Sequence, residues 1–208
     1  MDMLAVHARF RGRSSRRAEI VRNSAGALSR IDGVEPFQIL GVEDVRTTVD
    51  SPTALCNLVM ALLSDGQWAI GIGIGPLDAK ELTLEAASVA IDGRWRARHV
   101  AVFPVNLDQS PHLYQEQQQL AKNIAATFTL LGHVLAKRTM EGRQATSLVR
   151  QGLTQKQAAA QLRITKQAMS QRLQAAGWPA ENQGWELAHN LISTSERIAG
   201  QISKAPGS

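Results

Sequence analysis

Three glycines at every second position, Gly71, Gly73 and Gly75, stand in the apolar stretch WAIGIGIGPL. Glycine-rich turns can bind phosphate through backbone amides, so the stretch first suggests a nucleotide site. A dinucleotide-binding G-x-G-x-x-G, however, needs glycine at position 76, where this chain has proline. The Lys-Ser/Thr ending of a P-loop is missing as well. The spacing therefore does not predict a phosphate loop.

The same spacing fits a β-strand, because side chains alternate between the two faces of a strand. Trp68 and the isoleucines would lie on one face, toward a core, and the glycines on the other. A face without side chains lets a helix, a partner subunit or a ligand approach the backbone closely. We therefore expect a central strand here.

A second group of informative residues lies in LTQKQAAAQLRITKQAMSQRLQAAGWP, residues 153–179. Thr154 is typical of a helix N-cap, and Gln157 three residues later completes a capping box. Thr165 is a second N-cap, and the helix that it begins should end at Gly177. Two short helices joined by about three residues cross steeply, as in a DNA-binding helix-turn-helix. The alternative is a helical hairpin used for protein contacts.

The second of these helices would expose amide, hydroxyl and basic side chains. Glutamine can pair with adenine, serine and threonine can contact bases or phosphates, and Arg163, Lys166 and Arg172 would neutralise phosphates. Arg163 stands at the turn, where glycine is usual because the backbone is left-handed, so we expect some cost in stability. The predicted DNA-binding residues are Thr154, Gln155, Arg163, Thr165, Lys166, Gln167, Ser170, Gln171, Arg172 and Gln174.

The distribution of charge favours the same interpretation. The 208 residues carry a formal net charge of +5. Residues 132–178 contain eight Lys or Arg and one acid, a net +7 against −2 for the rest of the chain. This asymmetry is expected of a nucleic-acid-binding unit attached to a near-neutral domain.

Four short features are spread over most of the chain. These are GIGIG at 71–75, the GVEDV stretch at 41–45 in a hairpin position, the DG---AR spacing from Asp92 to Arg98, and the later helix-turn-helix pattern. Together they resemble the bacterial SatD family. The resemblance implies a front half like the catalytic core of class III nucleotide cyclases and GGDEF domains, which is a ferredoxin-like sheet.

Cyclase chemistry needs two carboxylates that hold a pair of divalent ions against a triphosphate. The resemblance places one of them at the end of the first strand, but HARFRGRSSRR contains no acid there. The hairpin keeps Glu43 and Asp44, so acids are present at only one of the two positions that a metal site needs. We expect no catalytic residues, no metal and no cofactor. Arg9, Arg11 and Arg13 could instead bind a phosphate or acidic ligand together with those acids, make a second DNA contact, or form a solvated basic loop.

The surrounding pattern predicts an α+β fold in two parts. Residues 1–110 show alternating strand and helix patterns, and the resemblance implies that they form a ferredoxin-like, nucleotide-cyclase-like antiparallel sheet with helices. Residues 111–139 are expected to form one long helix that serves as a linker or dimer seam. An all-α helix-turn-helix domain should span 140–203, and 204–208 should be a disordered tail.

Composition narrows the classes of protein further. Hydrophobic residues make up 44% and charged residues 20%, as in ordinary globular proteins. The first apolar run is too short for a signal peptide and precedes its charges, and no stretch is long enough to span a membrane. The single cysteine, Cys56, excludes an internal disulfide, and its apolar neighbours predict a buried thiol. We therefore expect a cytoplasmic protein.

These observations favour a DNA-binding transcriptional regulator over an enzyme. His99, His112, His133 and His189 are far apart, and no serine has a base in a recognisable motif, so nothing indicates zinc or nucleophilic catalysis. The expected partner is double-stranded DNA, bound as a homodimer, and the N-terminal domain would serve dimerisation or the sensing of a small-molecule effector. The alternative is a nucleotide-binding or nucleotide-processing enzyme with an accessory DNA-binding tail.

Overall fold

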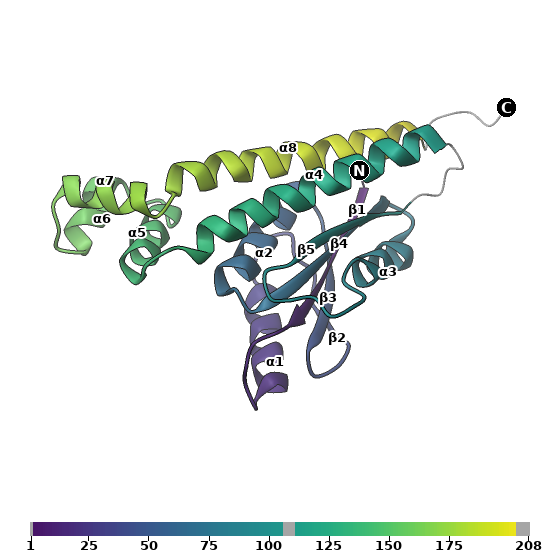
Figure 1. Cartoon of the computed structure of the whole chain (residues 1–208), viewed down its shortest axis with the longest axis horizontal. Coiled ribbons are helices and arrows are strands. Elements are labelled where there is room, and N and C mark those ends of the chain that lie inside the picture. Colours follow the sequence, from purple (N-terminus) through teal and green to yellow (C-terminus); the bar gives the residue numbers. More distant parts are fainter. Residues whose placement is uncertain (1, 106–110, 203–208) are drawn as a thin grey trace.

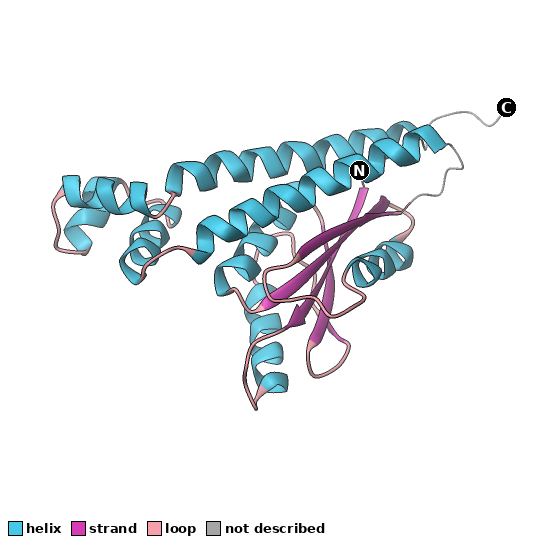
Figure 2. Cartoon of the chain, in the orientation of Figure 1, coloured by secondary structure: helices cyan, strands magenta, loops and turns pink. Residues whose placement is uncertain are grey.

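The computed structural model describes residues 2–105 and 111–202, and Figure 2 shows that they form a mixed α+β fold. The expected tail at 204–208 lies outside the described residues. Within the described part there are five strands and eight helices. In chain order these are β1 (Asp2–Phe10), α1 (Arg17–Leu28), β2 (Gln38–Ile39), β3 (Asp44–Val49), α2 (Pro52–Asp65), β4 (Trp68–Pro76), α3 (Lys80–Ala90), β5 (Val100–Pro104), α4 (Pro111–Ala136), α5 (Met140–Arg150), α6 (Gln155–Gln161), α7 (Lys166–Ala175) and α8 (Trp178–Ile202).

The strands form one sheet in the order β2-β3-β1-β4-β5. The first four strands are antiparallel to their neighbours and follow a β-α-β-β-α-β connectivity. The fifth strand, β5, is parallel to β4. The expectation of a wholly antiparallel sheet is wrong for this strand, because α3 carries the chain back across the sheet before β5 begins.

One face of the sheet supports the main hydrophobic core. Trp68, Ile70, Ile72 and Ile74 point to this face and are almost completely buried, as the alternation predicts. Helices α1, α2, α4 and α8 contribute buried side chains to the same core. In Figure 1, α4 and α8 run side by side along the top of the molecule.

The glycine face of β4 is covered by α3. A Cβ atom added at Gly71 would lie 2.0 Å from the carbonyl oxygen of Ala87, and one at Gly73 would lie 2.1 Å from that of Thr83. The expected close approach to a bare strand face is therefore confirmed, and the approaching element is a helix of the same chain.

The long helix α4 buries its apolar stripe within its own chain. Leu120, Ile124, Phe128 and Leu131 all belong to the main core, to which α8 also contributes. The expected division at residue 140 placed α8 with the DNA-binding unit, whereas the structure packs α8 along α4. A dimer seam on α4 would have to use its outer face, where Leu130 is 70% exposed.

Local details follow the sequence at most helix ends. Ser51 caps α2, as its position before Pro52 predicts. Helix α1 begins at Arg17 without a side-chain cap, and Ser14 Oγ accepts a hydrogen bond from the backbone N–H of Arg16. Cys56 is buried, as expected, and burial raises the pKa of its thiol to about 12. Among the described helices, none combines the length and apolar character needed to cross a bilayer.

Candidate nucleic-acid interface

Helices α5, α6 and α7 form a small unit with its own core at the left-hand end of Figure 1. Alanines lie where the helices touch, so the backbones pack closely, and leucine and methionine fill the centre. The buried members of this core are Ala145, Leu148, Ala158, Ala159, Met169 and Leu173. The core holds α6 and α7 in a fixed arrangement, with their other faces toward solvent.

Side-chain caps fix where α6 and α7 begin. Thr154 Oγ1 accepts a hydrogen bond from the backbone N–H of Gln157, whose side chain in turn accepts from the backbone N–H of Thr154 at 2.9 Å. Thr165 Oγ1 accepts from the backbone N–H of Ala168 at 3.1 Å. The predicted capping box and the second N-cap are both confirmed. The two hydroxyls are therefore engaged with their own helices, which limits them as DNA contacts.

The turn between the two helices contains a left-handed residue. Arg163 has φ of 55° and is one of two non-glycine residues with positive φ in the described part of the chain. Its backbone N–H donates to the carbonyl oxygen of Ala160 at 3.1 Å, and its side chain is exposed. The sequence-based expectation of a left-handed backbone at this position is confirmed.

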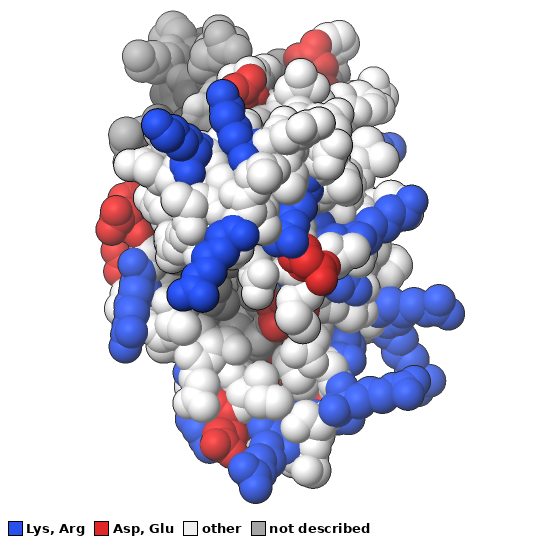
Figure 3. Space-filling view, turned by 90° about the vertical axis from the view of Figure 1, so that its left-hand side faces the viewer, with Lys and Arg blue, Asp and Glu red and all other residues white. Residues whose placement is uncertain are grey.

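Most of the predicted DNA-binding residues share this exposed surface. Figure 3 views this end of the molecule and shows Lys and Arg side chains spread over it, with fewer Asp and Glu. The exception is Arg172, which is half-buried. Arg172 acts on a nearby acid: the pKa of Glu141 is lowered by hydrogen bonds from the backbone of Glu141 itself and from Thr139, and the positive charge of Arg172 lowers it further. The exposed members are Thr154, Gln155, Arg163, Thr165, Lys166, Gln167, Ser170, Gln171 and Gln174.

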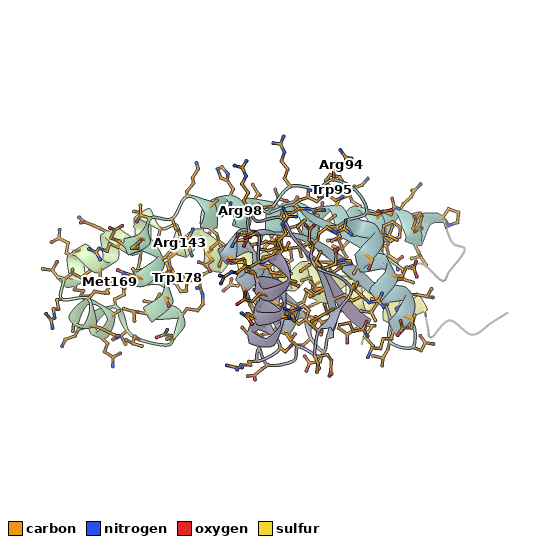
Figure 4. All side chains as sticks on the ribbon, turned by 90° about the horizontal axis from the view of Figure 1, so that it is seen from below. Arg94, Trp95, Arg98, Arg143, Met169 and Trp178 are labelled. Atoms are coloured by element: carbon orange, nitrogen blue, oxygen red, sulfur yellow. The ribbon has the colours of Figure 1, made fainter. Side chains whose placement is uncertain are left out.

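An ionic network attaches this unit to the rest of the molecule. Glu181 of α8 is 4% exposed and accepts hydrogen bonds from Arg138 and from Arg150, each at 2.5 Å. Arg138 also donates to the carbonyl oxygen of Ala176 at 2.8 Å. Arg143 of α5 donates to the carbonyl oxygen of Ser64 at the end of α2. Figure 4 shows Arg143 and Trp178 at this junction. No local sequence pattern indicates these contacts, since Arg138 and Glu181 are 43 residues apart and Arg143 and Ser64 are 79 residues apart.

The second candidate site, at the end of β1 and the start of β3, is also brought together. Arg9 Nε and His7 Nε2 lie 2.5 and 2.9 Å from Asp44 Oδ1. Glu43 pairs with Arg11 and with Arg17. Arg17 is not among the residues predicted from the sequence. Arg13, which is among them, is exposed. Burial would raise the pKa of Asp44, but the hydrogen bonds from His7 and Arg9, with their charges, bring it below its ordinary value. Both acids are therefore already paired with basic groups.

His7 also connects Asp44 to a serine from a distant helix. Its Nδ1 lies 2.8 Å from Ser88 Oγ on α3, so serine, histidine and aspartate form one chain of contacts that no sequence motif indicates. The order of groups resembles a catalytic triad. However, Ser88 Oγ donates to the carbonyl oxygen of Leu84, and His7 is only 3% exposed. The arrangement favours a structural connection between α3 and the sheet.

Comparisons with known proteins add little to this geometry. No protein-family model matches the chain, and no curated protein does. The resemblance to the SatD family therefore stays an interpretation of its motifs. Among solved structures, a regulator of polyketide synthase expression from Bifidobacterium adolescentis is similar to 98% of this chain and 86% of its own, at 14% sequence identity and a TM-score of 0.24. A similarity at this level supports no inference about function.

Proposed function

We propose that the protein is a DNA-binding transcriptional regulator that uses α6 and α7 as a helix-turn-helix. The observation that carries the proposal is the exposed face of α7. There Gln167, Ser170, Gln171 and Gln174 stand beside Lys166 on a helix whose opposite side is fixed by a packed core. Amide and hydroxyl groups can discriminate base edges, and the basic groups supply phosphate contacts.

The charge of the unit supports the proposal. Residues 154–175, which include both helices and their caps, contain Lys156, Arg163, Lys166 and Arg172 and no acid. A surface of this kind attracts the phosphate backbone and would give an affinity that falls with salt. A helical hairpin evolved for protein contacts does not require this imbalance.

We further propose that the chain binds DNA as a homodimer and that its N-terminal domain is a cyclase-like relative without catalytic activity. A single helix-turn-helix seldom gives enough affinity alone, and two-fold dimers on palindromic sites are the common solution. The two acids that would have to hold a pair of metal ions already form ion pairs: Asp44 with Arg9, and Glu43 with Arg11 and Arg17. Incubation with ATP or GTP and Mg²⁺ or Mn²⁺ tests this part, and turnover that a Glu43→Ala, Asp44→Ala variant loses would contradict it.

Selection from a pool of random DNA duplexes tests the main proposal. The full chain should enrich one sequence that contains two inverted half-sites, centred about 34–36 Å or a multiple of that distance apart. The exposed-arginine variant Arg22→Gln, altered on α1, should enrich the same sequence. If the pool shows no enriched sequence after repeated rounds, the protein is not a sequence-specific regulator.

A further inference from the structure

A pocket lies where the α5–α7 unit meets the sheet domain. It measures about 610 Å³ and is lined by residues of α2, α5 and α8, together with Ile31 after α1. Small-molecule sites commonly enclose about 300–1,000 Å³, so the space is large enough for a ligand of one or two rings. Its walls come from both parts of the molecule, and it is separate from the α7 surface.

Two tryptophans give the pocket an aromatic wall. Trp185 is held in place because its Nε1 donates to Asn57 Oδ1 at 3.3 Å and its ring stacks on His189. Trp178 is held by the guanidinium of Arg150, which lies 5.5 Å from the centre of its ring. Fixed aromatic faces favour flat aromatic groups, because these can stack or meet them edge-on.

Arg150 and Glu181 line the pocket, and with Arg138, which pairs with Glu181 from behind the pocket wall, they leave an excess of positive charge. Two guanidinium groups, those of Arg138 and Arg150, share the single carboxylate of Glu181. The side chain of Arg138 is 4% exposed, whereas that of Arg150 is 49% exposed and lines the pocket. One positive charge at the wall is therefore neutralised only in part, and arginine is suited to binding a carboxylate.

We propose that this pocket binds a small planar aromatic carboxylate. The tryptophans would contact its ring, Arg150 its carboxylate, and Asn57 and Asn182 its remaining polar groups. An occupant would touch α2 on one side and α5 and α8 on the other, so it would stabilise one position of the α5–α7 unit. The role of the pocket as an effector site depends on the proposed DNA-binding function. Binding of the ligand to the pocket does not depend on it.

Calorimetric titration of the full chain with benzoate, 1-naphthoate and indole-3-acetate tests the site. At least one of these should bind, and its primary amide should bind about ten-fold more weakly or worse, because the interaction with Arg150 loses its charge. Cyclohexanecarboxylate, which is not flat, should bind more weakly than benzoate. Equal binding of acid and amide, or no binding of any acid at millimolar concentration, would overturn the proposal.

Two variants locate the binding. Arg150→Gln should weaken the best carboxylate about ten-fold or more, and because Arg138 still pairs with Glu181 the variant is expected to fold. Ala61→Phe places a ring in the pocket from α2 and should abolish binding, with folding checked by circular dichroism. Arg22→Gln, an exposed arginine on α1, is the matched control. Unchanged affinity in both pocket variants would assign the binding to another place.

The role of the ligand is tested separately, on the selected duplex. Addition of the best carboxylate should change the DNA affinity of the wild-type chain and leave that of Arg150→Gln unchanged. The calorimetric titration contains no DNA, so a chain that does not bind DNA would still be tested for ligand binding in the pocket. A ligand that binds and does not alter DNA affinity would refute the effector role alone.

Discussion

Arg163 adopts a backbone conformation that costs an L-residue about 1–2 kcal/mol, although glycine would adopt it freely. Its side chain is exposed, so packing does not explain its presence. The position at the turn, beside the proposed recognition helix, is suited to a phosphate contact. We infer that arginine stands here for its charge and at the expense of stability.

Replacing this arginine separates the two effects. Arg163→Gly should raise the free energy of unfolding by about 1 kcal/mol and weaken binding to the selected duplex. Arg163→Gln should weaken binding to a similar degree without the gain in stability, since the backbone strain remains. Urea unfolding and fluorescence anisotropy measure the two quantities. If Arg163→Gly binds DNA as well as the wild type, the arginine does not contact phosphate.

Asp44 should make stability depend on acid pH. Because its pKa is lower in the folded chain than its ordinary value of 3.8, its contribution is complete above that value and is lost as the pH falls below it. Asp44→Asn should therefore be less stable than the wild type at pH 7, with the difference shrinking below about pH 4. Denaturant unfolding across this pH range measures the effect, with the exposed Asp32→Asn as control. A difference that stays constant would contradict this account of the His7–Asp44–Arg9 contacts.

The glycine strand β4 determines how closely helix α3 approaches the sheet. Gly73→Ala would bring a methyl group to 2.1 Å from the carbonyl oxygen of Thr83, so the helix or the strand must move. We expect a loss of about 3 kcal/mol or more in the free energy of unfolding. Gly26→Ala is the matched control: its added methyl meets no atom within 4 Å, and it should stabilise α1 by about 0.5–1 kcal/mol. A Gly73→Ala variant as stable as the wild type would mean that α3 packs less closely than described.

Features set by neighbouring residues could be predicted from the sequence. Alternation predicted the two faces of β4, and Thr154, Gln157 and Thr165 predicted where α6 and α7 begin. The sequence could not show which element covers the glycines, because a helix, a partner or a ligand needs the same bare surface. It also could not bring Ser88 to His7, since that contact depends on how α3 crosses the sheet.

The sequence was least informative about how the two parts of the molecule meet. Its pattern predicted one long helix over residues 111–139 but not that α8 of the same chain would pack along it. The ionic network around Glu181 and the pocket beside it arise only when α2, α5 and α8 come together. Contacts of this kind depend on the three-dimensional arrangement, and no local spacing encodes them.

Glu181 should hold the α5–α7 unit in place against the rest of the molecule. Glu181→Gln leaves the guanidinium of Arg138 buried without a carboxylate, so we expect a loss of about 3–5 kcal/mol. Hydrogen exchange should rise first in α5–α7. The exposed Glu186→Gln on the same helix serves as control. Exchange that rises evenly over the whole chain would show that the network has no special role at this junction.

Titration of the selected duplex shows whether the exposed face of α7 recognises DNA bases, as we propose. Gln167→Ala and Gln171→Ala should each weaken binding to that duplex by about 1–3 kcal/mol and leave binding to an unrelated duplex nearly unchanged. Gln183→Ala, on the exposed part of α8, should change neither affinity. If both α7 variants bind the selected duplex as tightly as the wild type does, α7 is not the recognition helix.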